Sequence, residues 1–184
     1  MNDNSQPAVG KVAADFSLKT EKGDTWTLSA QRGKVVALLF YPGDETLVCT
    51  KQLCSVRDNW NEYLATKAVV VGISRGTVEQ HQEFARHHHL PLPLLVDTRG
   101  EVTKSYRRHW WMPVTFTRAI VVIDAKGIIR YHRVMSRARR PTDYNVLSEI
   151  YAAQTDVRME KYQQLLESLR SRMKSRQDNE GREA

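Results

Sequence analysis

The chain has 184 residues, 41% of them hydrophobic and 27% charged, which suits one compact domain with a modest appendage rather than two domains. A chain of this length buries a core without a disulfide or metal staple, so its two cysteines are free for chemistry. Its 28 Lys and Arg against 21 Asp and Glu give a net charge of +7, but acids and bases interleave towards the C-terminus. This pattern predicts a solvated face rather than a nucleic-acid surface.

The composition also bears on location. No apolar run approaches the ~20 residues of a membrane span, and the polar start of the chain lacks the basic and apolar stretches of a signal peptide. We therefore expect a cytoplasmic protein that binds neither a membrane nor nucleic acid. Residues 1–10 are polar and follow no period, which predicts a flexible N-terminus.

The first elements alternate between strand and helix patterns. Apolar residues spaced around 16–18 and 26–28 predict two short, half-buried strands separated by a turn. Continuous apolar runs at 35–41 and 68–74 predict buried strands, and residues 50–64 between them predict a helix. These three elements make one βαβ unit with a right-handed crossover.

The second half continues this alternation and ends on a hairpin. Residues 124–127 have a turn-forming sequence, so the strands on either side are expected to pair antiparallel. The result is an α/β protein with a thioredoxin-like fold, in which helices flank a mixed central sheet. The expected elements are a helix at 78–88, a strand at 94–96, a short helix at 102–106, strands at 119–123 and 128–134, and a closing helix at 144–153.

An amphipathic stretch follows the predicted thioredoxin-like domain of residues 11–154. Apolar residues recur there at offsets of 3, 4, 7 and 11, which predicts an added C-terminal helix and a polar tail over 155–184. The helix either lies back on its own domain or forms a partner seam, so we expect a monomer or a homodimer. The residues of the stripe are Tyr162, Leu165, Leu166, Leu169 and Met173.

Cys49 and Cys54 follow the first buried strand, five residues apart. Cys49 lies near the start of the predicted helix, where unpaired N–H groups and the helix dipole favour the nucleophilic thiolate. The alternative is that both cysteines are small buried hydrophobes. For Cys54 taken alone, that alternative is the simpler one.

The surroundings of Cys49 favour chemistry. Pro42, Thr46 and Cys49 form a Pro-x-x-x-Thr-x-x-Cys motif, which resembles the active-site motif of the peroxiredoxins. The resemblance covers roughly residues 10–153, and the position of Cys54 resembles the bacterioferritin comigratory protein, or Q-type, subgroup. Further segments similar to the family occur in the family's order at 10–18, 33–42, 49–58, 71–74, 90–97 and 118–124.

The resemblance implies a thiol peroxidase that reduces hydrogen peroxide and organic hydroperoxides. Cys49 would be the peroxidatic nucleophile that becomes a sulfenic acid. Cys54 would be the resolving thiol that forms an intramolecular disulfide with it, and thioredoxin or a similar dithiol would reduce that disulfide. On an ideal helix the two Cα atoms are about 8.7 Å apart, whereas disulfides rarely span more than about 7 Å. Resolution would therefore require the helix to unwind locally.

The resemblance implies three supporting residues. Thr46 would supply a hydroxyl to the thiolate and the bound peroxide, and Pro42 would shield the thiolate from water. Arg118 would lie beside Cys49 at the end of the adjacent strand, where its charge stabilises the thiolate and its donors polarise the peroxide. No metal and no organic cofactor is required.

The sequence departs from the family at several positions. Leu47 and Val48 replace a usual Pro-Gly, and Ala14 stands where Pro is usual. The segment before Arg118 is short and aromatic, so Trp110 and Trp111 either border the site and favour bulky hydroperoxides or cover core. The preferred hydroperoxide therefore stays open.

Two other features carry weaker expectations. Adjacent helical residues point about 100° apart, so the histidines at 87–89 are not expected to converge on a metal. Asp44 and Glu45 are expected to point to water, because a thiolate site gains nothing from like charges.

Two alternative functions remain: a thioredoxin-like disulfide oxidoreductase, although its usual motif is Cys-x-x-Cys, and a non-catalytic binding module on the same scaffold.

Overall fold

The computed structural model describes residues 8–107, 117–156, 159 and 163, and its strands form one mixed sheet in the order β2-β1-β5-β4-β3-β6-β7. The strands are β1 (Ser17–Thr20), β2 (Thr25–Thr27), β3 (Val36–Phe40), β4 (Val69–Ser74), β5 (Leu94–Val96), β6 (Thr117–Ile123) and β7 (Ile129–Ser136). The helices are α1 (Leu47–Asp58), α2 (Trp60–Ala65), α3 (Val78–His87), α4 (Glu101–Arg107) and a helix over residues 143–156, with a 3₁₀ turn η1 (Ser29–Gln31).

The central strands explain why distant residues meet. β3 pairs in parallel with β4 and antiparallel with β6, and every residue of β3 and β6 is buried. The β3–β6 register ends with Phe40 opposite Ala119. Arg118 therefore lies beside the point where the chain leaves β3 and enters the loop to α1.

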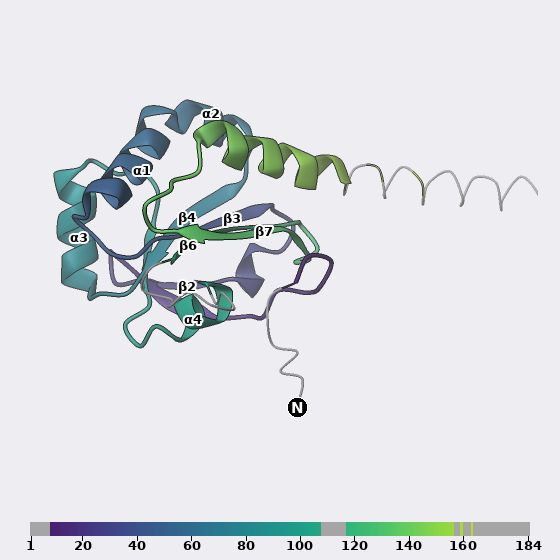
Figure 1. Cartoon of the computed structure of the whole chain (residues 1–184). Coiled ribbons are helices and arrows are strands. Elements are labelled where there is room, and N and C mark those ends of the chain that lie inside the picture. The colour runs from purple at the N-terminus through teal and green to yellow at the C-terminus, as the bar shows by residue number, and fades with distance from the viewer. Residues whose placement is uncertain (1–7, 108–116, 157–158, 160–162, 164–184) are drawn as a thin grey trace, which may run out of the picture.

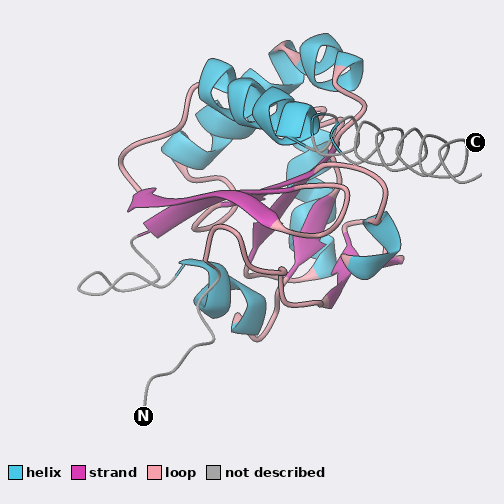
Figure 2. Ribbon diagram, turned by 90° about the vertical axis from the view of Figure 1, so that its right-hand side faces the viewer, coloured by secondary structure: helices cyan, strands magenta, loops and turns pink. Residues whose placement is uncertain are grey.

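Helices cover the two faces of the sheet unequally. α1, α2, α3 and the helix over 143–156 lie on one face, and α4 lies on the other (Figure 1). Side chains alternate along β3, so Leu39 packs under the four helices whereas Leu38 and Phe40 pack towards α4. Figure 2 shows the helix over 143–156 lying across the sheet on the more heavily covered face.

The helix predicted over 50–64 differs in the structure. It begins at Leu47, because extended backbone at Thr46 ends the loop and the Thr46 carbonyl accepts the first helical bond, from the amide of Thr50. It divides at Asn59, whose backbone departs from helical angles and whose side-chain amide donates to the Ser55 carbonyl. The single predicted helix is thus two, α1 and α2.

The remaining elements lie near their predicted positions. β7 extends to Ser136, and the closing helix runs over 143–156, through the domain boundary predicted after residue 154. Of the predicted flexible N-terminus, residues 8–10 are described, and the Gly10 amide donates to the Ile129 carbonyl. All five residues of the predicted apolar stripe at 155–184 lie outside the described residues. Within the described ranges, none of the helices combines the length and the apolar character that crossing a membrane requires.

Candidate active site

The loop from β3 delivers Cys49 into the first turn of α1. Pro42 is half-buried at the start of this loop, and Thr46 is exposed at its end. Cys49 is the third residue of α1, and its side chain is 0% exposed. The nucleophile proposed from the sequence therefore faces the interior, under the sheet-facing side of the helix.

Arg118 points its guanidinium at Cys49. The side chain is 1% exposed, and Nη2 donates to the Cys49 Sγ at 3.1 Å. Nη1 donates to the Gln52 side-chain oxygen at 2.7 Å, and Nε donates to the Arg137 carbonyl at 3.0 Å. The three bonds fix the planar guanidinium in one orientation, so that its charge and one N–H stabilise a thiolate at the Sγ.

Gln52 is a site residue that the sequence analysis missed. It is 3% exposed and lies three residues after Cys49, on the same face of α1. A polar side chain on the buried face of a helix needs a partner, and that partner is Arg118. The helical spacing from Cys49 was the available signal, but the partner is 66 residues away in the chain.

Thr46 and Pro42 lie at the mouth of the site. The Thr46 hydroxyl donates to the Gly43 carbonyl at 3.3 Å, and the hydrogen bonds of the described residues do not join it to Cys49. Its predicted contact with the thiolate and with bound peroxide therefore stays a prediction. Pro42 lies at the start of the loop, as the motif requires, and its shielding role stays a prediction too.

Cys54 lies on the same helix as Cys49. Both are free thiols, Cys49 buried and Cys54 half-buried, and α1 is continuous between them. Because ideal helical geometry holds their Cα atoms about 8.7 Å apart, a disulfide cannot form on this helix. The helix must therefore unwind locally before the two cysteines can form a disulfide, as predicted from the sequence.

The start of α1 is weakly held. Thr46 makes no side-chain capping bond, and the first turn contains no acidic residue. A missing cap costs about 1 kcal/mol of helix stability. The first turn, which carries Cys49, is thus the part of the helix most easily unwound.

Asp44, in the loop before α1, contacts the buried side chains of Tyr41 and His81, which contradicts one expectation. Asp44 was expected to point to water, but its carboxylate accepts from the Tyr41 hydroxyl at 2.8 Å and lies 2.9 Å from His81 Nδ1. His81 is fully buried, and its Nε2 lies 3.3 Å from the Ser74 hydroxyl. Burial raises the pKa of Tyr41 well above its usual value, which keeps its hydroxyl a donor to Asp44. These contacts fix the loop in front of Cys49.

The expectation for the histidine run was also wrong. His87 and His88 were expected to diverge, yet their rings stack with centroids 4.5 Å apart. His87 Nδ1 lies 3.2 Å and His88 Nε2 3.1 Å from the Glu45 carboxylate oxygens. Convergence is possible because His88 follows the last residue of α3 and has left helical geometry.

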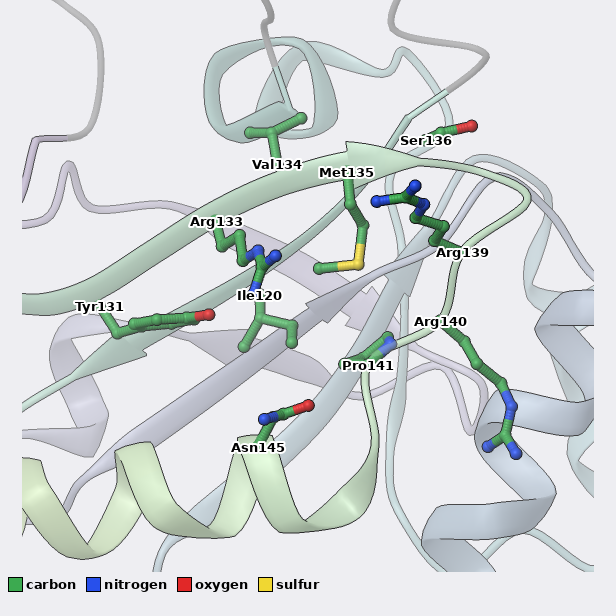
Figure 3. Close-up of a pocket in the computed structure, with 10 residues that line it drawn as sticks. All are labelled: Ile120, Tyr131, Arg133, Val134, Met135, Ser136, Arg139, Arg140, Pro141 and Asn145. Carbon is green, nitrogen blue, oxygen red and sulfur yellow. The ribbon is translucent and has the colours of Figure 1, made fainter.

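A hollow of about 510 Å³ opens on the face of the sheet that the helix over 143–156 covers (Figure 3). It lies between β7 and the helix over 143–156, with Ile120, Met135 and Pro141 among its apolar lining residues. Met135 pairs with Arg118 across the β6–β7 ladder, so one lining residue of the hollow lies on the strand position opposite Arg118. Cys49 does not line it. Trp110 and Trp111, considered as borders of the site, fall outside the described residues.

The chain is similar in sequence to members of one known family. Residues 9–132 match the model of the AhpC/TSA family. A putative peroxiredoxin bcp from Coxiella burnetii is 41% identical over 127 residues, which cover 66% of this chain and 84% of that protein. The chloroplastic peroxiredoxin Q of Triticum aestivum is 39% identical over 127 residues, or 66% of this chain and 57% of that longer protein.

Solved structures show the same fold. Peroxidoxin BcpB from Mycobacterium tuberculosis superimposes with a TM-score of 0.67 at 31% identity, over 78% of this chain and 96% of that one. The reduced 2-Cys peroxiredoxin of Plasmodium vivax superimposes with a TM-score of 0.72 at 24% identity, over 82% of this chain and 83% of that one, which bears on the fold alone. The predicted thioredoxin-like fold is confirmed, and the chain belongs to the AhpC/TSA family as a peroxiredoxin of the Q or Bcp type.

Proposed function

We propose that this protein is a thiol peroxidase that reduces hydrogen peroxide and organic hydroperoxides. The observation that carries the proposal is the buried Arg118 guanidinium, whose Nη2 donates to the Cys49 Sγ at 3.1 Å. A buried cation oriented on a thiol stabilises the thiolate before any substrate arrives. The matched segment spans only 57% of the wheat protein, so the activity is assigned here from the site and the family together.

The first step consumes the peroxide. The Cys49 thiolate attacks the distal oxygen of the hydroperoxide, a sulfur–oxygen bond forms and the peroxide bond breaks. The leaving oxygen takes up a proton and departs as an alcohol, or as water from hydrogen peroxide. Cys49 is oxidised to a neutral sulfenic acid. Developing negative charge on the peroxide oxygens is stabilised by the N–H donors of Arg118.

The second step forms a disulfide. The Cys54 thiolate attacks the Cys49 sulfur, and hydroxide leaves and is protonated to water. Because a neutral sulfenic acid is a weaker acceptor than a thiolate, oxidation weakens the Arg118 bond that holds the first turn of α1. The turn that must unwind is thus released by the reaction itself. Thioredoxin or a similar dithiol then reduces the disulfide by exchange.

The test follows thiols and intact mass after stoichiometric hydrogen peroxide is added to the reduced protein. The wild type should lose two thiols rapidly and about 2 Da, Cys54→Ser should trap a sulfenic acid, and Cys49→Ser should stay inert. A reaction at both cysteines no faster than that of an ordinary free thiol would leave a disulfide carrier or a binding module as the better function.

Two further proposals concern the whole protein. We propose a reducing compartment such as the cytoplasm, since both cysteines are free thiols and the cycle needs a dithiol reductant. Cell fractionation tests this location.

We also propose a monomer or a homodimer paired through the apolar stripe at 155–184. If the stripe forms the dimer, Leu165→Glu should reduce the sedimentation coefficient of the full chain, and an unchanged monomer value would favour the other state.

A further inference from the structure

Three potential metal ligands converge beside the active-site loop. One carboxylate oxygen of Glu45 lies 3.2 Å from His87 Nδ1, and the other lies 3.1 Å from His88 Nε2. The ligating atoms of the three residues all lie within 4.8 Å of one another. Two imidazoles and one carboxylate thus face a common point from two separate elements.

The distances suit a small tetrahedral ion. Zinc binds imidazole nitrogen and carboxylate oxygen at about 2.0–2.1 Å, which places two ligand atoms of a tetrahedron about 3.3 Å apart. The two Glu45 contacts, one through each carboxylate oxygen, are 3.2 and 3.1 Å, close to that spacing. The three ligand atoms lie within 4.8 Å of one another, and rotation of the exposed Glu45 and His87 side chains would bring them to the tetrahedral spacing. Two histidines and one carboxylate are also a ligand set that zinc takes in proteins, with a fourth position left to water.

The backbone directs these side chains towards one another. Glu45 has a φ of 52°, a left-handed conformation that bulky residues seldom adopt. This conformation turns the Glu45 side chain towards the end of α3 while Asp44 is held by Tyr41 and His81. Strained backbone persists only where the surroundings fix it, and here the two buried partners of Asp44 do so.

The same cluster includes a residue of the active-site loop and is linked to the end of α1. Glu45 lies four residues before Cys49, in the loop that leads into the first turn of α1. The His88 carbonyl accepts from Arg57 Nη1 at 2.8 Å, which ties the end of α3 to the end of α1. An ion shared by Glu45 and the two histidines would therefore add a further link between the weakly capped first turn of α1 and the end of α3.

We propose that Glu45, His87 and His88 bind a divalent zinc-like transition-metal ion, and that the bound ion slows formation of the Cys49–Cys54 disulfide by holding the active-site loop against α3. The binding site stands on its own geometry. The effect on the disulfide rests on the proposed peroxidase function.

The magnitude of the effect follows from linkage. If the ion binds only the folded loop, it slows a step that needs the loop to open by the factor 1 + [metal]/Kd. At a free zinc concentration of ten times Kd, disulfide formation should be about tenfold slower. The preceding oxidation of Cys49 does not require the first turn of α1 to unwind, so its rate should change far less.

Binding is tested by isothermal titration calorimetry with zinc chloride on the full chain without an affinity tag. Cys49→Ser and Cys54→Ser are present throughout, so that thiols cannot bind the metal. One zinc ion per chain is expected, and Glu45→Gln and His87→Ala should each weaken it at least about tenfold, because losing even an outer-shell partner costs that much. His89→Asn is the matched control: it removes the neighbouring histidine, keeps a residue that tolerates the φ of 53°, and should leave Kd unchanged.

Absence of zinc binding overturns the proposal. Binding that survives both Glu45→Gln and His87→Ala, or that falls equally with His89→Asn, overturns it as well.

The effect on the disulfide is tested in the reduced protein with both cysteines present. After hydrogen peroxide is added, disulfide formation is followed by quenched mass analysis with and without zinc. The proposal is supported if zinc slows disulfide formation in the wild type but not in Glu45→Gln. If zinc slows disulfide formation equally in both proteins, the effect comes from zinc bound to the thiols, and the proposal is overturned. If Cys49 of the zinc-free wild type is oxidised but no disulfide forms, resolution by Cys54 fails; if Cys49 is not oxidised, the peroxidase function fails. In either case the calorimetry still decides the metal site.

Discussion

Arg118 is the residue on which the site depends most. A buried guanidinium is costly unless its donors are paired, and its partners here are Cys49, Gln52 and the Arg137 carbonyl. Two of these three partners lie on α1. The cation therefore both activates the nucleophile and holds the helix that carries it.

Replacing Arg118 by lysine separates charge from geometry. Arg118→Lys keeps a cation but loses the planar fork, so peroxide oxidation of Cys49 should slow by about 10²-fold, the usual cost of removing one oriented donor. The second-order rate constant with hydrogen peroxide is the measurement. Arg133→Lys, at an exposed position of β7, is the matched control and should keep the wild-type rate. A near-normal rate in Arg118→Lys would mean that charge alone suffices.

Gln52 holds the Arg118 guanidinium through its side-chain oxygen. Gln52→Leu should leave the Nη1 donor unpaired and slow Cys49 oxidation by about tenfold, an effect on the scale of one buried hydrogen bond to a charged group. Lys51→Leu, at the exposed neighbouring position of α1, is the control. Rates are compared after the unfolding transition shows that both variants are folded. Equal rates in the two variants would remove Gln52 from the site.

At the scale of elements, α1 is held unequally along its length. Its second half is anchored through Asp143, which accepts from the Ser55 hydroxyl, from Asn59 at 3.2 Å and from the Tyr63 hydroxyl at 2.7 Å. Its first turn depends on Cys49 and Gln52 contacts with Arg118 and lacks a capping bond. Unwinding should therefore stop before Ser55, which leaves Cys54 in place to receive Cys49.

The weak first turn predicts how resolution can be slowed. Leu47 is 70% exposed at the start of α1. An acidic residue at this position interacts favourably with the helix dipole and stabilises the helix by about 0.3–1 kcal/mol. Leu47→Glu should thus slow disulfide formation about two- to fivefold relative to Leu47→Gln, which matches its shape without the charge. Quenched mass analysis of the Cys54-dependent step provides the rate. If the two variants resolve at the same rate, opening of the first turn does not limit the step.

At the scale of the whole molecule, the helix over 143–156 belongs to the core of the sheet's more heavily covered face. Ile150 is fully buried there, so Ile150→Ala should reduce the free energy of unfolding by about 2–5 kcal/mol. Tyr144→Ala, on the exposed side of the same helix, should change it by less than about 0.5 kcal/mol. Guanidinium unfolding monitored by circular dichroism measures both. Equal small losses would show that this helix contributes little to the domain.

Buried tyrosines predict how stability depends on alkaline pH. Burial raises the pKa of Tyr106 to about 12, and burial together with Asp143 raises the pKa of Tyr63 further. An unfolded tyrosine ionises near pH 10, so their contribution to stability is complete below about pH 10 and falls as pH rises towards and through the folded values. Unfolding free energies at about pH 8 and 11 should therefore differ less in Tyr106→Phe than in the wild type. Identical differences would contradict the shift at Tyr106.

Local patterns in the sequence determined the strand and helix order, the buried character of β3 and β4, and the place of Cys49 near a helix start. They did so because apolar periodicity and turn residues act over a few neighbouring positions. The pairing of Arg118 with Cys49 was expected only through resemblance to a family, since 69 residues separate them.

Tertiary structure alone decided the rest. It joined Gln52 to Arg118, placed Asp44 against the buried His81, and brought Glu45 to His87 and His88 across 42 and 43 residues of chain. It also divided the helix predicted over 50–64 at Asn59, whose side chain reaches Asp143. In each case strand order and helix packing bring the two partners together from distant parts of the chain. Such contacts leave no periodic pattern in the local sequence from which they could be predicted.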